Sequence, residues 1–167
     1  MATLHITSNG RVLDKLTQRL GEYARRASLS VQAGYWDHGF RYPVDEGALP
    51  GSVPKNVPTV AYENEYGGIN DFGKWTPARP FMRGTIAIYQ QQWVTAIAAG
   101  LSSGAGGQRV ANEVGQLMVS DIQTTIKESH QLFVPNAAVT VAKKGNNQPL
   151  IGRYHMLYNT VEYKVQS

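Results

Sequence analysis

The chain has 167 residues, 42% of them hydrophobic and 17% charged, with a net charge of +4 and no cysteine. The lack of cysteine excludes disulfides, thiolate metal sites and cysteine nucleophiles. The charged fraction is low against a usual value of about 25%, and sparsely charged surface is easier to desolvate, which favours a protein that binds partners.

The N-terminal region is predicted to form a helix over about residues 8–27. One apolar stripe recurs at steps of three and four residues, formed by Leu13, Leu16, Leu20, Tyr23 and Ala27. The residues before it lack a basic start followed by an apolar run, so we expect no secretory signal. We also find no stretch that approaches the ~20 apolar residues of a membrane span.

A strand and a long loop are predicted next. Apolar and polar residues alternate over Leu29–Trp36, which is the pattern of a strand with one buried face. Periodicity ends over residues 37–58, where prolines and glycines recur, so we expect a protruding loop. It carries Trp36, Phe40 and Tyr42 at its start. We interpret it as a docking arm; the alternative is a loop that folds back on its own core.

Three helices are predicted in the middle of the chain. A short one covers Val60–Tyr66 and ends at Gly67 and Gly68. A longer one covers about residues 80–101, with a buried face expected to consist of Met82, Ile86, Tyr89, Trp93 and Ile97. A glycine-rich break over residues 100–107 separates it from a helix at about residues 108–130, whose inward positions are Val110, Val114, Leu117, Met118, Ile122 and Ile126.

Two strands are predicted to close the chain. Val139 and Val141 alternate with polar or small residues, and Leu157, Val161, Tyr163 and Val165 are expected to share one face. The whole order predicts a single α+β domain over residues 1–167. We expect a small, mostly antiparallel sheet packed by about three helices, with the loop at 37–58 protruding.

The sequence offers no recognisable catalytic apparatus. None of His5, His38, His130 and His155 pairs with another at a metal-ligand spacing of three or four residues. The glycines at 100–107 lack the Gly-Lys-Ser/Thr ending of a phosphate-binding loop and follow a helix, not a strand. We therefore predict no enzymatic activity, no cofactor and no metal.

Two basic regions leave a nucleic-acid-binding module as the alternative function. One lies in the N-terminal helix and the other comprises Lys143, Lys144, Arg153 and Lys164. Basic faces attract nucleic acid, but these lack the interleaved aromatic residues of a base-stacking surface. The other interpretation is a solvated helix face and an exposed turn.

Several short sequence motifs occur in an order that resembles that of a known family. They are Val60–Tyr62, Asn64–Gly67, Pro77–Arg83, Pro149–Ile151 and Leu157–Val165, with a long helix containing Trp93 between the third and the fourth. In these motifs the chain resembles the neck and tail-completion proteins of long-tailed bacteriophages. These are head–tail joining proteins, and they include the minor tail protein Z-like group. The resemblance covers roughly residues 31–165, which is most of the chain. It departs at Gly152–His155, where the family has aspartate-threonine-glycine, and in the longer loop at 37–58.

The resemblance implies a structural virion protein that completes or terminates the tail and joins it to the head. Such proteins act as rings, often of six copies, between the tail tube protein and a head-side connector or stopper protein. The ring encloses a channel for genomic DNA, which passes without sequence-specific recognition. The implied location is the virion neck, and the host cytoplasm during assembly, with no membrane and no cofactor.

A ring subunit needs surfaces for its neighbours and for partners above and below. We expect Trp36, Phe40 and Tyr42 on the arm and Tyr163 on the last strand to contribute to them. Arg79 and Arg83 could be polar anchors around an apolar contact made by Phe81. The alternatives are core packing for Phe81 and solvated surface for the two arginines.

Overall fold

The computed structural model describes residues 29–166, and over these the α+β prediction is confirmed. The expected N-terminal helix lies outside the described residues. In chain order the elements are β1 (Ser30–Gly34), β2 (Arg41–Tyr42), β3 (Lys55–Asn56), α2 (Val57–Tyr66), β4 (Gly68–Ile69), β5 (Trp75–Thr76), α3 (Phe81–Ser102), α4 (Gly107–Lys127), α5 (Ser129–Leu132), α6 (Ala138–Lys144), α7 (Met156–Asn159) and β6 (Glu162–Gln166).

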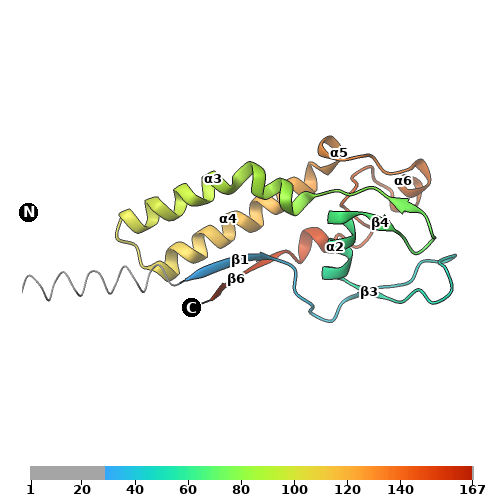
Figure 1. Ribbon diagram of the computed structural model, residues 1–167, viewed down its shortest axis with the longest axis horizontal. Helices are drawn as coiled ribbons and strands as arrows, with labels where there is room; N and C mark the ends of the chain where they lie inside the picture. The colour runs from blue at the N-terminus through green and yellow to red at the C-terminus, as the bar shows by residue number, and fades with distance from the viewer. Residues whose placement is uncertain (1–28, 167) are drawn as a thin grey trace, which may run out of the picture.

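A long hairpin of α3 and α4 forms one end of the molecule (Figure 1). The break between the helices is a tight turn in which Gly104 has a φ of 79°, a left-handed conformation that glycine adopts without strain. The ribbon of β1 and β6 lies along α4 on the side away from α3 (Figure 1). Helix α4 is therefore covered on two sides, and α3 on one.

The β1–β6 ribbon is antiparallel and joins the two ends of the described chain. Its register pairs Val31 with Val165 and Ala33 with Tyr163. Side chains alternate across a strand, so these four residues share the face that packs on α4. The pairs Ser30–Gln166 and Gln32–Lys164 are polar and face away.

The other end of the molecule is built from loops and short elements (Figure 1). Strands β2 and β3 pair across the loop at 37–58, and β4 and β5 form a second small hairpin. The central core lies where this end meets the hairpin, and it contains Phe81, Ile122, Ile126, Leu150 and Leu157. A second cluster of Trp93, Val110 and Val114 holds α3 to α4 further along. No helix among the described residues is both long and apolar enough to cross a membrane.

Three details of the sequence prediction are wrong. The segment at Val139 and Val141 is the helix α6, which pairs with no strand of residues 29–166 and ends at Gly145 in a left-handed cap with a φ of 75°. The last strand begins only at Glu162, since Leu157 lies in the short helix α7. Ile86 and Ile97 are exposed on α3, whose buried residues are Phe81, Thr85 and Trp93.

Candidate interaction surfaces

Glu65 on α2 caps the start of α3. Its carboxylate is buried and accepts hydrogen bonds from the backbone amides of Met82 (2.9 Å) and Arg83 (3.1 Å). The Nε of Arg83 donates to the same carboxylate at 2.8 Å. The first amides of a helix have no partner within it, and its N-terminus favours negative charge. Glu65 therefore supplies the cap that Pro80, which lacks a capping side chain, cannot provide.

The backbone around Glu65 joins the same two segments. The amide of Arg79 donates to the carbonyl of Asn64 at 2.7 Å. Gly67 has a φ of 70°, and a Cβ placed on it would lie 2.6 Å from the backbone nitrogen of Ala78. Glycine is needed there for its conformation and for the close approach. The two motifs Asn64–Gly67 and Pro77–Arg83 are thus parts of one junction.

The structure places the three predicted residues of this junction in different settings. Phe81 is fully buried in the core. The guanidinium of Arg79 is buried and donates to the carbonyl of Val134 and to Oδ1 of Asn136. Arg83 is partly exposed, pairs with Glu65 and lies with its Cζ 4.8 Å from the ring centre of Tyr66. Only Arg83 of the three reaches the surface to any extent.

The aromatic residues of the loop at 37–58 pack inward. Phe40 and Tyr42 lie against the central core and contact the ring of Tyr154, with ring centres 6.0 and 6.3 Å apart. Trp36 is half-buried, and Nζ of Lys164 lies 4.2 Å from its ring centre. The start of the loop is thus folded onto its own chain.

Asp37 ties the two ends of this loop together. Its carboxylate accepts from both terminal nitrogens of Arg41, from the amide of Gly39 and from Nδ2 of Asn56. The bond from Arg41, followed by that from Gly39, holds the pKa of Asp37 well below its usual range. Asn56 in turn caps α2 by accepting from the amide of Thr59. The loop therefore leaves and rejoins the fold at one fixed point.

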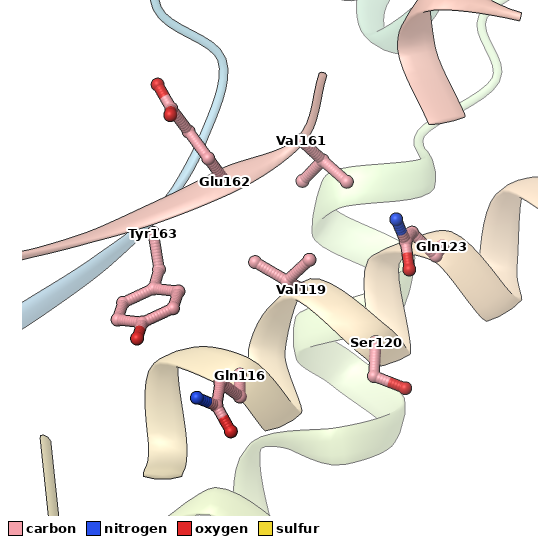
Figure 2. A pocket seen from close by; sticks show the side chains of 7 residues that line it. All are labelled: Gln116, Val119, Ser120, Gln123, Val161, Glu162 and Tyr163. Carbon is pink, nitrogen blue, oxygen red and sulfur yellow. The ribbon is translucent and has the colours of Figure 1, made fainter. Parts of the chain in front are cut away.

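Tyr163 of β6 packs against α4 and lines one edge of a shallow, open groove of about 340 Å³. Figure 2 shows the groove between α4, which contributes Val119, Ser120 and two glutamines, and the start of β6. The ring of Tyr163 packs on Gly115, where any Cβ would overlap it. Tyr163 is thus a packing residue between the ribbon and α4, with one edge in the groove.

The groove brings no acid–base pair to a nucleophile. Glu162 projects to the side of β6 opposite Tyr163, away from Ser120 (Figure 2). It pairs instead with Nε2 of His38 at 2.6 Å, on exposed surface. Within residues 29–166, no three histidine, aspartate or glutamate side chains gather as they would around a metal ion.

The outer face of α3 carries no charge from Gly84 onward, and its exposed residues are apolar apart from Gln90–Gln92, Thr95 and Ser102. No charged residue or histidine occurs from Gly84 to Gln108. Ile86, Val94 and Ile97 are exposed, Val94 by 56%. Their spacing places them on one flank of the helix, about 17 Å long at 1.5 Å per residue. Exposed apolar side chains that gather on one flank often mark a contact with a partner, and the described part of the chain covers only one side of α3.

A second apolar surface lies on the β4–β5 hairpin. Ile69 and Trp75 are cross-strand partners, and each is 74% exposed. The turn between them is fixed, since Oδ1 of Asn70 accepts from the amides of Phe72 and Lys74. In the same turn, the carboxylate of Asp71 pairs with Lys55, and the backbone carbonyl of Asp71 accepts from the amide of Leu49. The hairpin thus presents two large apolar side chains on a braced support.

These two surfaces and the buried cap were missed by the sequence prediction. Trp75 lies in a two-residue strand, which is too short to give a periodic signal in the sequence. Ile86 and Ile97 were assigned to the core, because apolar periodicity does not say which side of an apolar helix is covered. The uncharged run from Gly84 to Gln108 was the available signal for the α3 surface.

Comparisons of this chain with family models, with curated proteins and with solved structures return no match.

Proposed function

We propose that this chain is a structural subunit of a bacteriophage neck, which completes or terminates the tail and joins it to the head-side connector as a ring. The observation that carries the proposal is the exposed, uncharged outer face of α3. Apolar patches of this kind mark protein–protein contacts, and interface cores are depleted of charge. A subunit in which the described residues leave one side of α3 uncovered is suited to assembly.

The sequence motifs that resemble the phage neck family support the same proposal. Asn64–Gly67 and Pro77–Arg83, which carry the resemblance to neck and tail-completion proteins, meet in one junction through Glu65 and Gly67. Their order in the sequence therefore has a common structural reason. We propose partners above and below the ring of the kind the resemblance implies, a tail tube protein and a head-side connector or stopper, with a channel through which DNA passes.

The direct test is disruption of the gene in its source phage. We expect filled heads and separate tails that do not join, and restoration of joined particles when the wild-type chain is supplied from a plasmid. Electron microscopy of the lysate provides the measurement. Complete infectious particles in the absence of the chain would reject a neck role.

The mass of the purified chain over a wide concentration range provides a second readout. A closed oligomer, six copies being the expected number, supports the ring. The alternative function, a basic nucleic-acid-binding module, predicts instead a monomer whose affinity for DNA falls steeply with salt. Four described cations are already engaged with acids, namely Arg41, Lys55, Arg83 and Arg109.

A further inference from the structure

Arg79 is a buried cation that meets no acid among residues 29–166. It is only 6% exposed, and its side chain donates to the carbonyl of Val134 at 3.4 Å and to Oδ1 of Asn136 at 3.1 Å. Both acceptors are neutral, and the first bond is longer than the usual range of about 2.7–3.2 Å. Nη1 of Arg79 has no partner among the described residues, yet it is not fully buried, since no fully buried side-chain nitrogen or oxygen there lacks a partner. Part of the guanidinium is therefore accessible to a ligand.

Lys144, at the end of α6, is a second cation of the same kind. Its Nζ donates to the carbonyls of Gln148 at 2.8 Å and Pro149 at 3.3 Å, and it forms no ion pair within the described part of the chain. Asn136 joins the two cations, because its Oδ1 accepts from Arg79 and its Nδ2 donates to the same carbonyl of Gln148. Burial, with the nearby charge of Arg79, lowers the pKa of Lys144 to about 8. One short segment thus holds two positive charges close together.

We propose that Arg79 and Lys144 form a binding site for a doubly charged oxyanion of the phosphate type. Two desolvated cations without a counter-ion destabilise a fold, and an anion bound to both reduces that cost. The arginine fork and the lysine ammonium are the usual protein partners of phosphate. A free phosphate group carries a charge of about −1.5 to −2 at pH 7, which matches the two cations. A carboxylate or a nucleic-acid phosphodiester supplies only one charge. The site does not depend on the proposed neck function.

The melting temperature of the full-length chain in increasing phosphate tests the site. The buffer is Tris chloride at pH 7.5, with sodium chloride at matched ionic strength as the control. At ten times the dissociation constant we expect a saturable rise of roughly 3–6 °C, because a ligand that binds only the folded chain stabilises it. Phosphate also raises melting temperatures non-specifically, but that effect does not saturate. A rise with no saturable part would overturn the inference.

Lys144→Met and its matched control Lys143→Met distinguish this site from others. The two variants lose the same charge on the same helix, but Lys143 is exposed. Lys144→Met should weaken phosphate binding by about tenfold or more, as expected when one charged hydrogen-bond donor is removed. Lys143→Met should bind phosphate as the wild type does. Equal saturable rises in the two variants would place the anion elsewhere and overturn the inference.

Isothermal titration calorimetry identifies the class of anion. Acetate should bind at least about tenfold more weakly than phosphate, and a short DNA duplex without terminal phosphates should show no affinity that depends on Lys144. Arg79→Lys keeps the charge but loses the fork, so this variant, once circular dichroism shows it to be folded, should bind phosphate more weakly. Acetate binding equal to that of phosphate, duplex binding that Lys144→Met abolishes, or wild-type affinity in Arg79→Lys would each reject the proposed site.

Discussion

The two ends of this molecule are held together largely by different contacts. At the hairpin end, α3 meets α4 mainly through apolar packing of Trp93, Val110 and Val114, although Nε1 of Trp93 also donates to Oδ2 of Asp121 at 2.6 Å. Helix α3 itself has no charge beyond Arg83. At the loop end, charged groups join the segments. Glu65 caps α3, Asp37 closes the loop at 37–58, and Lys55 bridges Glu63 and Asp71.

This difference indicates that the contacts that hold the fold together are separate from the surfaces that are available to bind partners. Polar contacts are directional, so they fix loops that have little apolar surface to bury. Apolar packing has no direction, and a helix held on one side in this way keeps its other side available. The hairpin end therefore offers its uncovered side, whereas the loop end offers a hairpin braced by charges.

The largest effect is expected from removing the cap at the boundary of the two ends. Glu65→Ala leaves the first amides of α3 without their acceptor and Arg83 without its carboxylate. We expect a loss of about 2–4 kcal/mol in the free energy of unfolding. Denaturant unfolding followed by far-UV circular dichroism measures it, at a concentration where the chain is monomeric.

Glu63 provides the matched control for this prediction. It lies on the same helix and pairs with Lys55, but its side chain is 44% exposed. Glu63→Ala should cost only about 0–1 kcal/mol, as for other surface pairs. Equal losses for the two variants would mean that the cap adds nothing beyond an ordinary surface ion pair.

The sequence predicted the long elements well and the short ones poorly. Helices α2, α3 and α4 and strand β1 follow from periodicity and glycine breaks, which are local signals. The hairpins β2–β3 and β4–β5 consist of two-residue strands, which are too short to show alternation, and β2 and β3 pair across a long loop. Helix α6 was misassigned because alternating valines fit a strand equally well over so short a run.

The interaction surfaces were only partly accessible to sequence reasoning. Aromatic residues at 36, 40 and 42 indicated an arm, but a sequence cannot say whether such rings turn inward, as Phe40 and Tyr42 do here. Their role in an interface stays a prediction. Low overall charge pointed to assembly, yet the location of the uncovered surface required knowing which side of α3 meets α4.

Alanine substitutions at two glycines, one on each long helix, are expected to change stability by an intermediate amount and in opposite directions. A Cβ on Gly115 of α4 overlaps the ring of Tyr163, whereas a Cβ on Gly84 of α3 meets nothing within 4 Å. Gly115→Ala should destabilise by about 1–3 kcal/mol through overpacking, reduced by a helix-propensity gain of up to about 1 kcal/mol. Gly84→Ala should keep that gain, and thermal unfolding of both variants measures the contrast.

A double-mutant cycle identifies the cause of the Gly115 effect. If the ring of Tyr163 is the obstacle, Gly115→Ala should become neutral or stabilising in a Tyr163→Ala background. An unchanged penalty in that background would place the strain elsewhere on α4. It would also leave Tyr163 free for the interface role predicted from the sequence.

The smallest effect is expected at the loop end, from the pH dependence of stability. Nζ of Lys144 donates to the carbonyls of Gln148 and Pro149, and burial, with the nearby charge of Arg79, lowers the pKa of Lys144 from 10.5 to about 8. Between these values the unfolded chain holds a proton that the folded chain has lost. Stability should therefore rise with pH from about 8 upwards, having been reduced at lower pH by the buried charge.

We expect this rise to appear in the melting temperature between pH 7.5 and 9.5, as roughly 2–4 °C, or about 1 kcal/mol. The upper limit avoids pH values above 10.0, where the tyrosines act in the opposite direction, since burial raises the pKa of Tyr42 from 10.0 to about 12. Lys144→Met should abolish the rise, whereas Lys143→Met, on the exposed side of α6, should retain it. If Lys144→Met melts with the same pH profile as the wild type, the buried ammonium is not the group that makes the loop end sensitive to pH.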